Sequence, residues 1–103
     1  MIIYNVTVNI DHDSHDDWLD WMKSVHIPDV MATGSFLENK ISKVLSDQDD
    51  GGITYAIQYV SKDMDTYENY LKEHAPRLQQ EHSARYEGKF AAFRTLLEVV
   101  HSQ

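Results

Sequence analysis

The stretch from Asp17 to Phe36 constrains the fold most, because it combines a helical pattern with an internal proline and contains both tryptophans. Apolar residues recur there at the i, i+3, i+4, i+7 spacing of one helix face: Trp18, Trp21, Met22 and Val25. Pro28 disfavours helical geometry at Ile27, so we expect this helix to end near His26. Pro28 then begins a short second helix that ends before Gly34.

Alternating apolar and polar residues predict strands before and after this helical stretch. The first strand covers residues 2–10, where one face is apolar and the other mostly polar. Residues 36–45 and 53–60 have the same character, and the turn-forming residues 47–52 between them predict a hairpin. A long last strand covers residues 90–100 and carries apolar residues on both faces.

A second helical segment lies between the hairpin and the last strand. Asp63 or Asp65 caps its start, and apolar residues follow at helical spacing. Pro76 kinks or breaks this helix at Ala75, and Gly88 ends its continuation. No linker or repeat interrupts the pattern, and 103 residues fit one domain, so we expect a single domain over residues 1–103.

The element order is therefore β-α-β-β-α-β, which predicts an α+β, ferredoxin-like fold. A four-stranded antiparallel sheet would have the first and third strands in its centre and two helices on one face. The other face carries the polar side chains of Asn5, Thr7 and Gln58, and we place Arg94 and Leu96 there too. Such a half-apolar face favours a covering partner, and a second copy of the sheet is the simplest one.

Composition argues against several kinds of binding partner and several kinds of site. The net charge of −8 disfavours binding to nucleic acids or anionic membranes, and the absence of cysteine excludes disulfides and thiolate metal sites. The N-terminus has no basic region followed by a long apolar run, so we expect no signal peptide, no membrane span and a cytoplasmic location.

The chain resembles the dimeric α/β-barrel superfamily, in which two ferredoxin-like protomers pack sheet to sheet. The resemblance covers essentially the whole chain and rests on the element order, the W-x-x-W-M first helix, the H-x-P sequence at His26 and Pro28, and the turn before Gly34-Ser35-Phe36. Within the superfamily the chain is most similar to small bacterial domains of unknown function. The superfamily also includes cofactor-free monooxygenases, haem-binding and haem-degrading proteins, muconolactone-type isomerases and polyketide cyclases.

His26 is the best candidate for a catalytic residue, because a neutral imidazole is a versatile base near neutral pH. The resemblance implies a pocket between the helices and the sheet, and we expect His26 to be the only histidine there. Aromatic and apolar residues would form the ligand-binding walls: Trp18, Met22, Tyr55 and Tyr59. The alternatives are a helix-end histidine that binds the last carbonyl groups and aromatic residues that only fill the core.

The sequence predicts no metal site and no cofactor. His12 and His15 lie in an acidic loop without zinc-like spacing, and His74 and His82 are about 12 Å apart along one helix. A haem bound by His26 is an alternative, but two bulky tryptophans on the helix leave little room for a porphyrin.

Two functions remain open at the level of sequence. One is a homodimeric protein that binds or converts a small hydrophobic or aromatic molecule, in the manner of a cofactor-free monooxygenase or isomerase. The other is a non-catalytic homodimeric interaction module. A nucleic-acid-binding function is disfavoured, because the open sheet face lacks stacking aromatic residues on its central strands.

Overall fold

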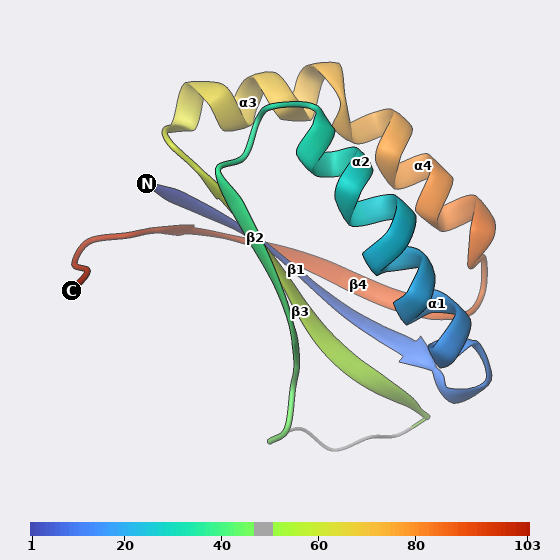
Figure 1. The fold of residues 1–103 in the computed structure, drawn as a ribbon. Helices are drawn as coiled ribbons and strands as arrows, with labels where there is room; N and C mark the ends of the chain where they lie inside the picture. Colours follow the sequence, from blue (N-terminus) through green and yellow to red (C-terminus); the bar gives the residue numbers. More distant parts are fainter. Residues whose placement is uncertain (47–50) are drawn as a thin grey trace.

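The computed structural model describes residues 1–46 and 51–103, so most of the turn predicted at residues 47–52 lies outside the described residues. Two helical segments follow the first and the third strand along the chain (Figure 1). The elements are β1 (Ile2–Asp11), η1 (His12–Ser14), α1 (His15–Trp21), η2 (Met22–His26), α2 (Ile27–Ala32), β2 (Glu38–Lys43), β3 (Gly52–Ser61), α3 (Met64–Glu73), α4 (Ala75–Arg85) and β4 (Phe90–Glu98).

The four strands form one antiparallel sheet in the order β2-β3-β1-β4. The first and third strands are central, as the sequence predicts, and the helices cover one face of the sheet (Figure 1). Residues of β1 lie opposite residues of both neighbours, with Tyr4 opposite Tyr59 in β3 and Leu96 in β4. This arrangement is the predicted α+β, ferredoxin-like fold.

The first helix does not end near His26, which corrects the sequence-based expectation. Residues 15–32 remain helical throughout, and the segment η2 is a π-helix in which the Ile27 N–H donates to the Met22 carbonyl, five residues earlier. Pro28 follows directly, in the first turn of α2. A wider π turn accommodates a proline that would clash with the carbonyl four residues before it in an α-helix.

The second proline acts as predicted. The chain leaves helical geometry at His74, and α4 begins at Ala75 with Pro76 in its first turn. Asp63 caps α3 through its side chain, which accepts a hydrogen bond from the Thr66 N–H at 2.8 Å. None of the helices formed by the described residues is both long and apolar enough to cross a membrane.

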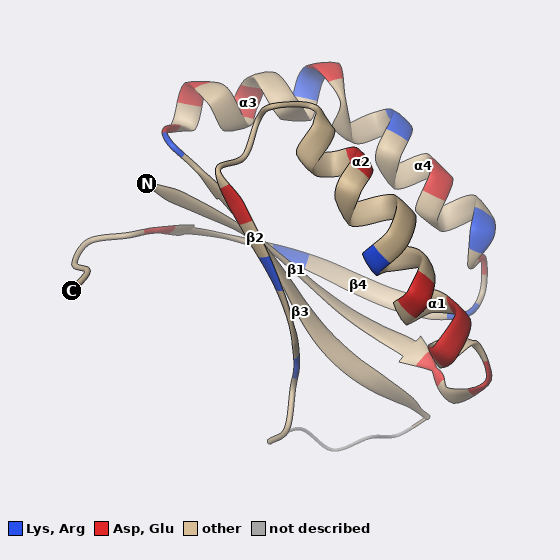
Figure 2. Ribbon diagram, in the orientation of Figure 1, with Lys and Arg blue, Asp and Glu red and all other residues tan. Residues whose placement is uncertain are grey.

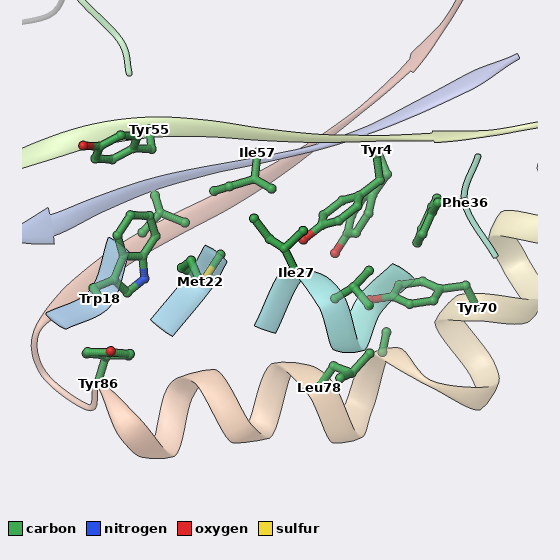
Figure 3. Packing of buried hydrophobic residues seen from close by; sticks show 14 of the residues in the cluster. Tyr4, Trp18, Met22, Ile27, Phe36, Tyr55, Ile57, Tyr70, Leu78 and Tyr86 are labelled. Carbon is green, nitrogen blue, oxygen red and sulfur yellow. The ribbon is translucent and has the colours of Figure 1, made fainter. Parts of the chain in front are cut away.

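The core lies between the helices and the sheet (Figure 3). Side chains from β1 and β3 meet those from α1, η2 and α2 on one side and from α3 and α4 on the other. Trp18 and Ile57 are almost completely buried, whereas Val25 is 40% exposed although its spacing predicted a core position. The π turn explains Val25, because it shifts the buried side of the helix to Ile27 and Val30.

The open face of the sheet has a different composition from the one predicted. Residues paired across antiparallel strands share a face, and Arg94 pairs with Val6 while Leu96 pairs with Tyr4. Arg94 and Leu96 therefore lie on the helix side, which corrects their predicted position. The open face instead carries Phe93, 63% exposed, and other apolar side chains: Ile3, Val60 and Leu97.

Candidate functional site

A cavity of about 50 Å³ lies between η2, α2, α4 and the helix-facing side of the sheet. This volume is enough for a few water molecules. The residues that line it are Tyr4, Val6, Val8, Met22, His26, Val30, Ile57, Tyr59, Tyr70, Leu78, Gln79, His82, Ser83, Phe90, Ala92 and Arg94. Ser83 and Arg94 are exposed residues, so the cavity approaches the surface between α4 and β4.

His26 is the last residue of the π-helical segment, and its imidazole is packed among other rings. It stacks on the Trp21 ring with 5.1 Å between centroids and lies edge-on to the His82 ring at 5.7 Å. Its Nδ1 atom is buried and has no hydrogen-bond partner among the described residues. Such a buried, unsatisfied nitrogen costs about 1–3 kcal/mol, which is unusual in a purely structural core.

His82 of α4 is the second imidazole of the cavity, and its protonation state follows from one hydrogen bond. The Trp18 indole N–H donates to His82 Nε2 at 2.9 Å. An indole is only a donor, so Nε2 must be an unprotonated acceptor. His82 is therefore a neutral imidazole whose proton is on Nδ1, and Trp18 fixes this tautomer.

Burial keeps both imidazoles uncharged at neutral pH. The pKa of His26 is lowered to about 4, chiefly by burial; Asp29 opposes this shift and Arg94 contributes to it. Burial likewise lowers the pKa of His82 to about 4, with smaller contributions from His26 and Arg94. Two neutral imidazoles thus lie side by side at one end of the cavity.

Arg94 and the buried tyrosines provide further polar groups of the cavity, besides Gln79 and Ser83. The Arg94 Nε donates a hydrogen bond to the Tyr4 hydroxyl at 3.0 Å, which joins β4 to β1. Burial raises the pKa of Tyr59 and of Tyr70 above the ordinary value, and neighbouring tyrosines add to the rise. These phenols therefore remain protonated and neutral.

The structure brings together three of the five residues that the sequence predicted for the site. His26, Met22 and Tyr59 line the cavity, whereas Trp18 and Tyr55 do not. Trp18 lies behind His82 and contacts it by the indole hydrogen bond.

Tyr55 belongs to a separate group of polar side chains at the start of α1. Its hydroxyl is 2.7 Å from Nε2 of His15, and the His15 Nδ1 is 3.0 Å from the Asp16 carboxylate. The His15 and Tyr55 rings stack with 5.6 Å between their centroids. This group contributes to the attachment of α1 to β3 and not to the cavity.

Sequence reasoning missed His82 as a site residue, and it considered Arg94 as a partner for an acidic group or an anionic ligand but placed it on the open face of the sheet. His26 was expected to be the only histidine there, and His82 corrects this expectation. The sequence signal for His82 was weak, because its position beside the cavity depends on the packing of α4 against η2. No local pattern encodes that packing. Among the described residues, no three histidine, aspartate or glutamate side chains are grouped closely enough to hold a metal ion.

A comparison with known protein families identifies the family of this chain. Residues 1–100 match the family described as "Domain of unknown function (DUF4286)", and the chain therefore belongs to that family. A comparison with curated proteins found no significant match.

Solved structures share the fold at low sequence identity. SnoaB, a cofactor-independent oxygenase from Streptomyces nogalater, superposes with a TM-score of 0.69 at 12% identity and covers 98% of this chain and 95% of its own. A dimeric ferredoxin-like protein from an uncultured marine organism has a TM-score of 0.70 at 12% identity, with 100% and 98% covered. The de novo designed protein Foldit4 reaches 0.64 at 8% identity, with 95% and 97% covered. A designed protein among these structures makes it plain that the likeness concerns the fold and not the chemistry.

Proposed function

We propose that this member of the DUF4286 family binds a small, largely apolar molecule in the cavity between η2, α4 and the sheet, and that His26 exchanges a proton with it. The observation that carries the proposal is the pair of neutral imidazoles on a cavity wall, one of which has a buried Nδ1 without a hydrogen-bond partner in the described part of the chain. Binding sites of this kind are mostly apolar and contain a few well-placed polar groups.

The local structure around His26 supports the proposal. Short π-helical segments inside α-helices occur frequently at functional sites, and η2 ends at His26. Trp18 acts as a positioning group, because its hydrogen bond holds the neighbouring His82 in a single tautomer. A neutral imidazole beside a second one that carries its proton on Nδ1 is suited to accept or relay a proton.

The proposed chemistry uses no cofactor. A proton transfer to or from an acidic C–H or O–H group requires only a positioned base, as in the cofactor-free isomerase and oxygenase types of reaction. The similarity in fold to the cofactor-independent oxygenase SnoaB agrees with this proposal. A haem does not fit, because a porphyrin is far larger than a cavity of about 50 Å³, in which a one-ring compound already extends to the opening between α4 and β4.

We also propose that the protein is a homodimer formed through the open sheet face. Phe93 is 63% exposed there and Leu97 is 42% exposed. The two central strands carry no charged residue other than Asp11, as Figure 2 also shows. The similar marine protein is described as dimeric. Light scattering at micromolar concentration should give twice the chain mass, and Phe93→Glu should shift the protein towards monomer; a monomeric wild type would contradict the proposal.

The binding experiment uses ¹⁵N-labelled protein titrated with benzoate and benzamide, two one-ring compounds of equal size. We expect amide resonances of η2 and α4 to shift with either or both compounds. His26→Ala should weaken that binding at least about fivefold, which corresponds to the loss of one hydrogen bond. The unfolding midpoint of the variant should show that the fold persists. If neither compound shifts these resonances, the proposal is wrong.

A second candidate function is the non-catalytic homodimeric module, and one observation favours it. The cavity is narrow, and most of the interface between helices and sheet is filled with rings in direct contact. If the titration shows no binding while light scattering shows a dimer, this second function is the better one.

A further inference from the structure

The charge of the cavity wall is opposite to that of the whole protein. The chain has a net charge of −8. Among the described residues that line the cavity, none is an aspartate or glutamate, and Arg94 is the only arginine or lysine. Because both histidines of the wall are neutral, the wall carries one positive charge.

The surroundings of Arg94 do not neutralise this charge. Its one hydrogen bond to a described side chain goes to the Tyr4 hydroxyl, and no carboxylate of the described residues forms an ion pair with it. Asp29 lies close enough to raise the pKa of His26, but it is exposed and does not line the cavity. The guanidinium is therefore available to an anion, for which it is the preferred partner in proteins.

The hydrogen bond to Tyr4 fixes the position of the guanidinium. Tyr4 is 3% exposed and its ring packs against Tyr59 and Tyr70, so its hydroxyl is a rigid anchor for the Arg94 Nε. An arginine held through Nε keeps its terminal N–H groups for a ligand. The apolar wall beside it, which includes Met22 and Phe90, suits a planar carbon skeleton.

We propose that the ligand of this cavity is a small planar oxyanion, that is, a carboxylate, phenolate or enolate on one ring or a comparable flat skeleton, whose anionic oxygen binds Arg94. This inference rests on the proposed binding function and adds the charge of the ligand to it. The flat skeleton lies along the apolar wall, and the neutral imidazoles of His26 and His82 face it without competing for the anion. A neutral compound of the same shape binds less tightly, because it forms no charge-assisted hydrogen bond with Arg94.

The test compares benzoate with benzamide at pH 7.5, where benzoate is an anion and the two imidazoles are neutral. Dissociation constants are measured by NMR titration for the wild type, Arg94→Gln and Arg94→Lys. Lys72→Gln is the matched control, since it also removes one positive charge, from an exposed residue of α3 that does not line the cavity. Urea unfolding of each variant checks that the fold persists.

We expect the wild type to bind benzoate about tenfold more tightly than benzamide. Arg94→Gln should reduce this preference to within about twofold, Arg94→Lys should keep part of it, and Lys72→Gln should keep all of it. Equal binding of the two compounds by the wild type, or an unchanged preference in Arg94→Gln, would overturn the inference while leaving the binding function in place. Binding of neither compound would overturn both.

Discussion

Two aromatic clusters hold the helices on the sheet, and they differ in what their polar atoms do. The tyrosine cluster lies where α2, α3 and β2 approach the centre of the sheet and consists of Tyr4, Phe36, Tyr59, Tyr67 and Tyr70. The histidine cluster lies between α1, η2 and α4 and consists of Trp18, Trp21, His26, His82 and Tyr86. Figure 3 shows members of both clusters between the two layers.

The tyrosine cluster is held by ring packing. Phe36 is in contact with three tyrosines, with 4.8 Å between its ring centroid and that of Tyr70 and 5.1 Å to that of Tyr59. Burial raises the pKa of Tyr59 and Tyr70, so these two hydroxyls stay neutral at neutral pH. Neither of them therefore gains a charge when the solution is acidified.

The histidine cluster depends on a protonation state. Trp18 donates to an unprotonated nitrogen of His82, and protonation of that nitrogen would remove the acceptor. His26 has an unsatisfied nitrogen in the same cluster. The comparison teaches that two aromatic regions of one core can differ in how they respond to protonation, because only the histidine cluster contains imidazoles.

Phe36→Ala should have the largest effect on stability, because it removes the ring around which the tyrosine cluster packs. Phe36 is 6% exposed. We expect the free energy of unfolding to fall by about 3–5 kcal/mol. Urea unfolding at pH 7.5 and fixed protein concentration measures it, and Phe36→Leu serves as a milder control. A loss below about 1 kcal/mol would show that the cluster is not held by packing.

Acid should destabilise the protein through the histidine cluster. Both imidazoles have a pKa of about 4 in the folded chain against an ordinary value of 6.5. The unfolded chain binds more protons between these values, so the stability present above pH 6.5 is lost as the pH falls towards 4. The loss is up to about 3 kcal/mol for each imidazole.

Urea unfolding between pH 7.5 and 4.5 measures this loss. A double variant, His26→Gln with His82→Gln, should flatten the pH dependence, because glutamine does not titrate and can still accept from Trp18. The matched control, His74→Gln with His101→Gln, removes two histidines outside the cluster. It should keep the wild-type slope of unfolding free energy against pH. An equally steep slope in the first double variant would assign the acid sensitivity to other groups.

The two prolines illustrate how far the sequence predicts the backbone. At Pro76 the helix breaks at His74, as local rules predict. At Pro28 the same rules fail, because packing of η2 on the sheet keeps the chain helical and a π turn accommodates the ring. The positions of the strands along the chain follow from apolar periodicity, which is a local property, and the central position of β1 and β3 follows from the β-α-β-β-α-β order of the elements.

The candidate site was harder to predict than the fold. His26, Met22 and Tyr59 were found because they lie on the apolar faces that meet in the core. Arg94 was placed on the wrong face, because β4 has apolar residues on both faces and its alternation does not show which one is covered. His82 was missed as a site residue because its partners are distant in sequence.

Substitutions of two tyrosines test where the site ends. They have the smallest expected effects on stability. Tyr55→Phe and Tyr4→Phe each remove one phenol hydroxyl with a defined partner, His15 in one case and Arg94 in the other. Each loss should lower the free energy of unfolding by about 1 kcal/mol. Their effects on ligand binding should differ, because Tyr4 lines the cavity and Tyr55 does not.

For benzoate we expect Tyr55→Phe to keep the wild-type dissociation constant within about twofold and Tyr4→Phe to raise it about threefold to tenfold, since Arg94 loses its anchor. NMR titration at pH 7.5 measures both constants, and the similar stabilities of the two variants remove unfolding as an explanation. A stronger effect of Tyr55→Phe would move the site towards His15 and Asp16. In that case the group of polar side chains at the start of α1, and not the histidine cluster, would form the ligand-binding site.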